Sequence, residues 1–381
     1  MQRVEFLQGV LAAATTTATS PIAPTILQQL TIGVNVPLTG VYGSYGLEVA
    51  KGVRAAVDET NKLNATLNKV YGVRTFDDQN SGAIATSNVL VAASDPSIVG
   101  MVGNLTLDVT LASLFQYANA GFALAVPCVT GDQLTRQGYH NVFRLPASDS
   151  AEGLLFARAV LRGKPPMNVL GVIVDKDYGL DTATAFVAQA KAVKHHAQLI
   201  TLESNADVPD SSAIIARNQP GYIFLAGRPE KLGPIAVALR TGGYTGDFGL
   251  ADSFYSEDTI KTYGKTLNGA LVASSLPPLK RVPSIVAYFQ DFQNEVGSIT
   301  AFSAYGYAAA QLLIQASQRA NALNRFQLLT QLQNGGTYQL KTENYSFGPF
   351  GDATLPNIFL FTLTPDGFTF AMPAVRDGFV V

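Results

Sequence analysis

Residues 31–57, TIGVNVPLTGVYGSYGLEVAKGVRAAV, place a short apolar run directly before a segment whose apolar residues recur every three or four positions. The run is typical of a buried strand, and the segment is typical of an amphipathic helix. Seven further runs are predicted strands of the same kind: Val70–Phe76, Ser97–Val102, Ala123–Val126, Val169–Val174, Ala197–Leu202, Gly221–Ala226 and Gly269–Ala273. Continuous apolar strands separated by helices predict parallel α/β sheets that are covered on both faces by right-handed crossovers.

Two breaks interrupt this alternation. Arg144-Leu145-Pro146 ends the first series, and a new helix is predicted at Asp149–Leu161 before strands resume. A proline-rich passage ends the second series, and three helical segments follow without a strand, the longest at Ile299–Leu323. The chain returns to strand-like runs from Phe347 onward. These breaks predict two doubly wound lobes, with a ligand site where the carboxyl ends of their strands face each other.

The composition restricts the classes of partner. Only 14% of the residues are charged and the net charge is −2. The chain therefore lacks the basic field that attracts nucleic acid or an anionic membrane surface, and we expect neither as a partner. A single cysteine, Cys128, excludes an intramolecular disulfide.

The N-terminus has the order of residues found in export signals. Arg3 precedes an apolar run from Gly9 to Ala14, and small residues continue to Ser20. A positive start, an apolar middle and a small-residue exit predict that residues 1–20 are an export signal. An alanine-rich helix at the N-terminus is the alternative. No apolar stretch reaches the roughly 20 residues of a membrane span.

Motifs for catalysis and cofactor binding fail on spacing. Gly40–Gly46 repeats glycine every third residue, and Thr259 stands where the first glycine of a P-loop would precede Gly264–Thr266. No G-x-S-x-G sequence occurs. His195-His196 is predicted at the C-terminal end of a helix, where the helix dipole favours a positive charge. We prefer this interpretation of the two histidines to a metal site. We therefore expect no enzyme activity, no cofactor and no metal.

A set of short motifs follows in one order along the chain: Ile32–Gly40, Tyr45-Gly46, Asp77-Asp78, Val99-Gly100, Pro127 with Thr130, Asn141–Arg144, Asp175–Gly179, Tyr305–Ala309 and Phe347–Phe350. From about Thr31 to about Phe370, the sequence resembles the leucine/isoleucine/valine-binding family of periplasmic receptors, the type I substrate-binding proteins of ABC transporters. The resemblance implies two Rossmann-like lobes joined by a three-crossing hinge. Lobe one would comprise residues 31–146 plus 275–347, and lobe two would comprise residues 147–274 plus 348–381.

The same resemblance implies a function. The chain would be an exported, periplasmic and monomeric receptor that closes its lobes on a small solute. It would then deliver the solute to an ABC permease in the inner membrane. The expected ligand is a small amino acid or an apolar or aromatic carboxylate. A cytoplasmic sensor of the same fold, which regulates a partner protein, is the alternative.

Ligand-binding residues of lobe one follow from the resemblance. The segment Gly103–Asp108 is similar to the family's first ligand loop, whose backbone N–H groups can hold a carboxylate. Leu107 stands where the family usually has a serine, so Thr106 or Asp108 would take over its part. Tyr45 would face the pocket for the ligand's side chain.

The second loop and lobe two supply the other candidates. Cys128 would lend its carbonyl and Thr130 its hydroxyl, with a turn or helix cap as the alternative for Thr130. Tyr178 would pack over the ligand, and Asp252 would pair with an ammonium unless it caps the helix that follows. Arg228 would suit a second carboxylate or another anion through paired hydrogen bonds, unless it is a solvated loop residue.

Overall fold

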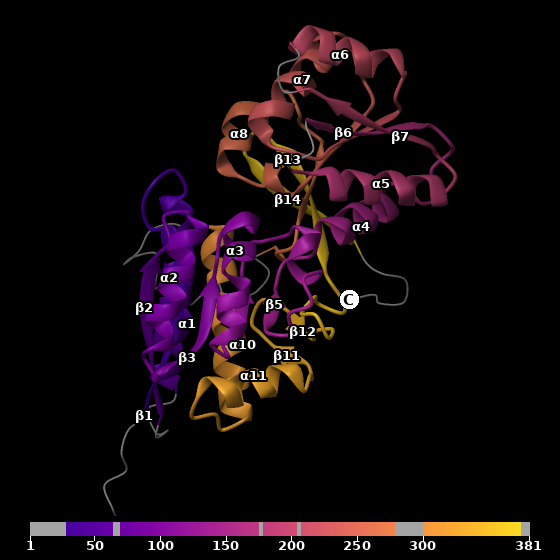
Figure 1. The fold of residues 1–381 in the computed structure, drawn as a ribbon. Coiled ribbons are helices and arrows are strands. Elements are labelled where there is room, and N and C mark those ends of the chain that lie inside the picture. The colour runs from indigo at the N-terminus through magenta and orange to yellow at the C-terminus, as the bar shows by residue number, and fades with distance from the viewer. Residues whose placement is uncertain (1–27, 64–68, 175–177, 204–206, 279–299, 375–381) are drawn as a thin grey trace, which may run out of the picture.

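The computed structural model describes residues 28–63, 69–174, 178–203, 207–278 and 300–374. These residues form two lobes, each built around its own sheet, at the lower left and upper right of Figure 1. The first sheet has five parallel strands in the order β2-β1-β3-β4-β5. They are β1 (Gln28–Val36), β2 (Lys69–Asp77), β3 (Ile98–Gly103), β4 (Leu124–Val126) and β5 (Val142–Arg144).

Helices cover both faces of this sheet. Buried residues of α1, α10 and α11 pack with Leu30, Ile32 and Val34 on one face, and those of α2 and α3 pack with Ile98 and Met101 on the other. The helices are α1 (Gly43–Leu63), α2 (Gly82–Ala93), α3 (Leu107–Asn119), α10 (Ala301–Arg319) and α11 (Arg325–Gln333). A strand buried on both faces needs the near-continuous apolar sequence from which it was predicted.

The second sheet has seven strands in the order β14-β13-β10-β9-β8-β6-β7. The parallel strands are β6 (Asn168–Val174), β7 (His196–Leu202), β8 (Tyr222–Leu225), β9 (Asp247–Leu250) and β10 (Leu271–Ser274). The strands β13 (Ile358–Thr364) and β14 (Gly367–Ala374) extend it as an antiparallel hairpin. Its parallel part, β7-β6-β8-β9-β10, repeats the doubly wound order of the first sheet, which confirms the predicted α/β fold.

Helices also cover both faces of the second sheet. Residues of α4 and α5 form one buried cluster with it, and residues of α6, α7 and α8 form another. These helices are α4 (Asp149–Leu161), α5 (Leu180–Ala192), α6 (Val208–Arg217), α7 (Pro229–Thr241) and α8 (Glu257–Tyr263). Among the described residues, none of the helices combines the length and the apolar character that a bilayer crossing requires.

Several details differ from the sequence-based expectation. The short strands β5 and β9 were not among the predicted runs, because three or four residues carry too little pattern. His196 begins β7 instead of ending a helix, and buried His195 pairs its Nε2 with the carbonyl of Leu161 at 3.0 Å. The predicted helix from Ile299 ends at Arg319. Residues 1–20, 175–177 and the first of the three predicted helical segments lie outside the described residues.

The chain passes between the lobes from β5 to α4, from β10 to α10, and from β12 (Asn344–Tyr345) to β13. β12 pairs with β11 (Tyr338–Gln339) in a small separate sheet. Ala147 N donates to Ser275 Oγ at 3.0 Å, which joins the first two crossings. Arg144 N donates to Gly351 O at 2.9 Å, which joins the first and third. The numerical bounds of the two lobes stay a prediction.

The guanidinium of Arg144 fixes this junction. Arg144 is 1% exposed, and its Nε and Nη2 donate to Asp352 Oδ1 in the third crossing. Its Nη1 donates to the carbonyls of Thr130 and Gly131, each at 2.7 Å. A buried guanidinium is tolerated when its donors are matched in this way. The end of β5, the loop at Thr130 and the third crossing are therefore held together.

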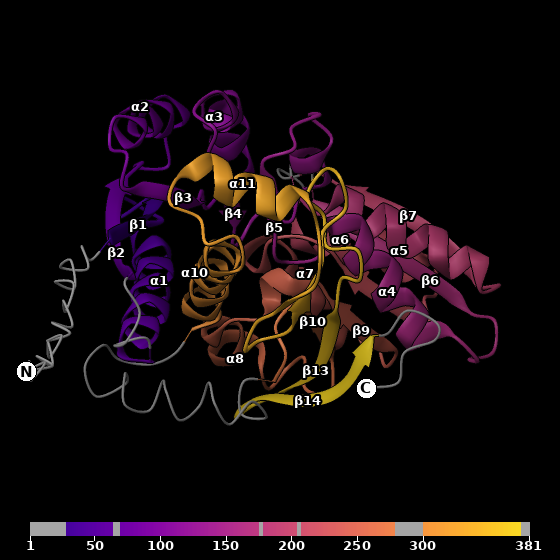
Figure 2. The ribbon, with the colours of Figure 1, turned by 90° about the horizontal axis from the view of Figure 1, so that it is seen from below.

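The helices α1 and α10 pack side by side (Figure 2). Two glycines allow this close approach. A Cβ on Gly52 would lie 1.9 Å from Ser303 O, and a Cβ on Gly306 would lie 2.2 Å from Val49 O. Both distances are far below van der Waals contact with backbone atoms, which cannot rotate away. The close pairing of these helices therefore requires glycine at both positions.

We expect Gly306→Ala to lower the free energy of unfolding by about 1–3 kcal/mol, because the added methyl forces the two helices apart. Gly348→Ala is the matched control, since its Cβ would meet only Asp352 O at 3.7 Å. The control should change stability by less than about 0.5 kcal/mol. Urea unfolding of the three proteins measures both values, and equal stabilities for Gly306→Ala and the wild type would contradict the packing argument.

Candidate ligand-binding site

Three residues predicted in lobe two meet where its parallel strands end. The hydroxyl of Tyr178 donates to Asp252 Oδ1 at 3.0 Å, and the guanidinium carbon of Arg228 lies 5.7 Å from the centre of the Tyr178 ring. Tyr178 follows β6, Arg228 follows β8 and Asp252 follows β9, and these three strands are neighbours in the order β6-β8-β9. The carboxyl edge of a doubly wound sheet is the usual position of a ligand site.

Asp252 and Arg228 each had an alternative role, as a helix cap and as a solvated loop residue. Asp252 does not cap the following helix, because α8 begins after Ser256, whose side chain accepts from Thr259 N. Asp252 instead opens a short 3₁₀ turn, and its carboxylate faces Tyr178. Arg228 is exposed, as the solvated-loop alternative expects, but it lies over the Tyr178 ring.

Two acidic residues that sequence reasoning did not assign to a site join this cluster. Asp149 and Glu152 stand in the first turn of α4 and are 8% and 2% exposed. The backbone N–H of Asp252 donates to Glu152 Oε1 at 3.1 Å. Residues three apart share one face of a helix, so the sequence Asp149-Ser-Ala-Glu152 already contained the signal. It was interpreted only as the start of a helix.

Burial and mutual repulsion raise the pKa values of this acidic wall, which we define as Asp149, Glu152 and Asp252. Burial raises the pKa of Asp149 to about 7, and the charges of Asp252 and Asp132 add to the shift. Burial and the charges of Asp252 and Asp149 hold the pKa of Glu152 well above its ordinary value. Burial also raises the pKa of Asp252, although Tyr178 donates to it. Burial and like charge therefore disfavour the ionised form of the wall, and a cation would stabilise that form.

The second loop of lobe one touches the acidic wall. Thr130 O accepts from Asp149 N at 3.0 Å, and a hydrogen bond from the Thr130 side chain lowers the pKa of the Asp149 carboxyl. Thr130 does not cap a helix, because the 3₁₀ helix that follows it, Asp132–Thr135, has Gly131 as its N-cap, and α4 is capped by Ser148. Cys128 is half-buried against the first-lobe core, and burial raises the pKa of its thiol. The hydroxyl of Thr130 is thus directed at a protein carboxylate.

The first loop offers fewer side-chain donors than predicted. Thr106 precedes α3, and its hydroxyl donates to Asn80 Oδ1 at 2.8 Å. Leu107 packs toward Gly131, where an added Cβ would lie 2.7 Å from Leu107 Cδ2, and Asp108 is exposed. The Thr106 hydroxyl is therefore engaged within the protein, and Asp108 carries no hydroxyl that could replace that of the missing serine. The backbone N–H groups of the first turn remain as donors.

Aromatic residues of lobe one complete the surroundings. Tyr45 is 41% exposed, and its ring centre lies 4.8 Å from that of Phe302. Tyr305 of α10 was predicted only as part of a helix motif. Burial raises the pKa of Tyr305, and the charge of Asp252, which belongs to the other lobe, adds to the shift. Glu343 also acts on Tyr305, and burial raises the pKa of Glu343 to about 8.

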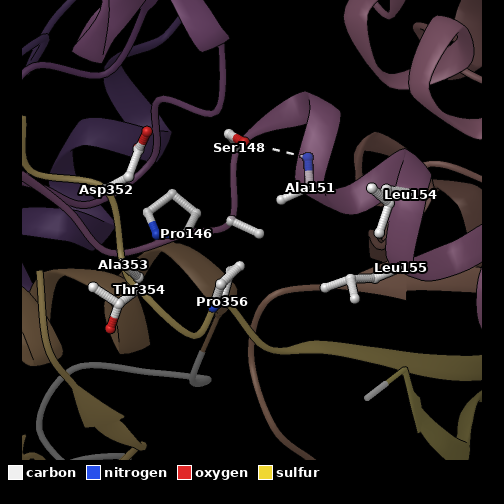
Figure 3. Close-up of a pocket in the computed structure, with 10 residues that line it drawn as sticks. Pro146, Ser148, Ala151, Leu154, Leu155, Asp352, Ala353, Thr354 and Pro356 are labelled. Carbon is white, nitrogen blue, oxygen red and sulfur yellow. Dashed lines mark hydrogen bonds between the residues drawn. The ribbon is translucent and has the colours of Figure 1, made fainter. Parts of the chain in front are cut away.

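A pocket lies beside the crossings instead of at this cluster (Figure 3). It is lined by the first crossing, the start of α4 and the third crossing: Pro146, Ala147, Ser148, Ala151, Leu154, Leu155, Asp352, Ala353, Thr354 and Pro356. None of the nine predicted ligand-binding residues lines it. We assign this pocket to the hinge. Within the described ranges, no group of His, Cys, Asp and Glu side chains is arranged to hold a metal ion.

We expect Asp149→Asn to stabilise the empty protein at pH 7.5 by on the order of 4 kcal/mol. The folded carboxyl, with a pKa of about 7 against an ordinary 3.8, binds more protons than the unfolded one between these values. The free energy of unfolding therefore falls as pH rises through this window, and the variant lacks that loss.

Urea unfolding from pH 4 to pH 7.5 measures the difference between variant and wild type, which should grow with pH. Asp181→Asn, in the first turn of α5 and outside the acidic wall, is the control and should not gain stability over the wild type as pH rises. A difference for Asp149→Asn that does not change with pH would show that the carboxyl titrates normally.

Comparison with known proteins identifies the family. A profile described as "Periplasmic binding protein" matches residues 29–365. A Leu/Ile/Val-binding protein homolog 1 of Brucella suis is 24% identical over 339 residues, which cover 87% of this chain and 89% of the relative.

Two crystal structures share the fold. Leucine-binding protein LivK of Thermotoga maritima has a TM-score of 0.77 at 18% identity, covering 92% of this chain and 100% of the other. A solute-binding protein of R. palustris in complex with benzoate has a TM-score of 0.71 at 16% identity, covering 91% and 97%. With its two doubly wound lobes and the profile match over most of its length, the chain belongs to the periplasmic binding protein family.

Proposed function

We propose that the chain is an exported substrate-binding protein of an ABC importer, and that its ligand is a small amino acid. The observation that carries the proposal is the acidic wall with Tyr178 and Arg228 at the carboxyl edge of the second sheet. A wall of carboxyl groups that repel one another favours a ligand with an ammonium group. The name of the Brucella suis relative supports the same ligand class.

Each lobe would contribute one part of the recognition. Asp252 and its acidic neighbours would accept hydrogen bonds from the ammonium, and the N–H groups at the start of α3 would donate to the carboxylate. Tyr178 from lobe two, with Tyr45 and Tyr305 from lobe one, would enclose the ligand's side chain. Because the contacts come from both lobes, the ligand binds the closed form better than the open form and shifts the population toward closure.

Arg228 favours a second candidate ligand class. Its exposed guanidinium over the Tyr178 ring can receive a carboxylate that lacks an amine. The R. palustris structure with benzoate supports this alternative at the level of the fold. An apolar or aromatic carboxylate would then occupy the cleft without using Asp252.

The remaining parts of the proposal concern cellular context. The family consists of solute-binding proteins, and we propose that this chain is non-catalytic, monomeric and docks on an inner-membrane permease. Residues 1–20 would direct it to the periplasm, although they lie outside the described residues. An intact N-terminus on protein recovered from the cytoplasm would favour the ligand-sensor alternative.

Matched ligands separate the two ligand classes. L-leucine, 4-methylpentanoate and isoamylamine share one apolar side chain and differ in carrying both charged groups, only the carboxylate or only the amine. We expect L-leucine to raise the unfolding midpoint most, since a hundredfold excess over Kd stabilises by about 2.7 kcal/mol. Thermal unfolding with each compound, and with benzoate, measures this. A larger shift with 4-methylpentanoate or benzoate would replace the amino-acid ligand with a simple carboxylate.

Two substitutions test which residue contacts a charged group of the ligand. Asp252→Asn should weaken L-leucine binding by about tenfold to a hundredfold, because a hydrogen bond to a charged group contributes about 1.5–3 kcal/mol. Arg228→Ala should change it by less than about threefold. Isothermal titration calorimetry gives both values. The reverse order, with loss only in Arg228→Ala, would move the anionic contact to Arg228 and leave Asp252 without a role in binding.

A further inference from the structure

A network of buried polar side chains lies beneath the first ligand loop of lobe one. Asn35, Asp78, Asn104 and Ser113 are each 0% exposed. They come from the end of β1, the residue after β2, the residue after β3 and the middle of α3. Replacing such groups by apolar ones of similar volume is often neutral or stabilising, so their cost calls for a role other than stability.

Asp78 is the centre of this network. Its Oδ2 accepts from Asn104 Nδ2 at 2.8 Å, and its Oδ1 accepts from Asn80 N at 2.9 Å. The second proton of Asn104 Nδ2 goes to Asn35 O at 3.1 Å, and Asn104 Oδ1 lies 3.2 Å from Ser113 Oγ, whose one proton it shares with Val109 O at 2.9 Å. With these bonds made, the side chain of Asn104 has one orientation.

A second branch leads from Asp78 to the start of α3. Asn80, whose backbone is held by Asp78, accepts the Thr106 hydroxyl proton on its Oδ1 at 2.8 Å. Thr106 O in turn accepts from Thr110 Oγ1 at 2.7 Å within α3. One carboxylate therefore anchors both ends of the stretch from Asn104 to Thr106, which sets the direction of the first helical turn (α3 in Figure 1).

We infer that Asp78 is a positioning residue for ligand binding, which acts through Asn104 and Asn80 to aim the first N–H groups of α3 at the ligand's carboxylate. The inference rests on the proposed function, because it requires that this turn faces the ligand. It goes beyond that function by assigning the geometry of the loop to a residue that does not touch the ligand.

The chemistry of the two contacts explains why an acidic residue is needed. Both partners of Asp78 are N–H donors, and a carboxylate offers an acceptor oxygen to each. Asparagine has the same shape but offers one oxygen and one NH₂ group. Asp78→Asn must therefore place a donor against a donor at Asn104 or at Asn80, and one anchor of the loop is lost.

Affinity and local exchange distinguish positioning from simple structural support. We expect Asp78→Asn to weaken L-leucine binding at least tenfold in calorimetry on folded protein. We also expect faster amide hydrogen exchange in residues 105–110 under conditions where the rest of lobe one exchanges as in the wild type. A purely structural role predicts lower stability in urea with an unchanged Kd and unchanged local exchange, and that result would overturn the inference.

Asp95→Asn is the matched control. Asp95 accepts from Ser97 and Arg74 at the opposite edge of the same sheet, so its loss should leave Kd and the exchange of residues 105–110 unchanged. If Asp95→Asn weakens binding as much as Asp78→Asn does, the effect is a general one of lobe one and the inference is wrong.

Two further arms keep the inference testable. If Asp78→Asn does not fold, Ser113→Ala is the second variant, because it removes one bond to Asn104 with little change in volume. We expect Ser113→Ala to bind L-leucine two- to fivefold more weakly. Unchanged binding would refute the inference. If the wild type binds neither L-leucine nor benzoate, the proposed function fails by itself. The exchange of residues 105–110 then decides, and wild-type exchange in Asp78→Asn would overturn the positioning role.

Discussion

The buried guanidinium of Arg144 is the interaction on which the rest of the structure depends. Its donors reach Asp352 in the third crossing and the carbonyls of Thr130 and Gly131 in the second ligand loop. Thr130 O also accepts from Asp149 N, at the start of α4. The same side chain therefore fixes where the lobes join and where the acidic wall begins, so hinge and candidate site share one anchor.

The periodicity of the sequence predicts the fold well, because a doubly wound sheet needs continuous apolar strands and amphipathic helices of recognisable length. Asp149–Leu161 was predicted with the bounds that the structure shows. The short strands β5 and β9 were missed because they are held by neighbours in the sheet, as when Arg144 N bonds to Gly351 O across 207 positions of the chain. Such pairings depend on tertiary contacts that local patterns do not contain.

The candidate site was predicted less completely than the fold. The resemblance to the family placed Tyr178, Arg228 and Asp252 in one region, and the structure brings them together. The hydrogen-bond partners of the site residues could not be predicted in this way. The Thr106 hydroxyl donates to Asn80, and the Thr130 hydroxyl donates to Asp149 across the first crossing, so both acceptors lie far from their donors in the sequence. The i, i+3 spacing of Asp149 and Glu152 shows only that they share a helix face, because the partner of Glu152, Asp252 N, lies 100 positions away in the sequence.

The two halves of the candidate site differ in whether their polar groups are already satisfied before a ligand binds. In lobe one, the network around Asp78 is satisfied in the empty protein, so binding there requires no rearrangement of its side chains. In lobe two, the acidic wall holds carboxyl groups whose charges burial and mutual repulsion disfavour. An ammonium group removes that repulsion only when it reaches the wall. Under the proposed function, lobe one would therefore be preorganised, and the gain that drives closure would come from lobe two.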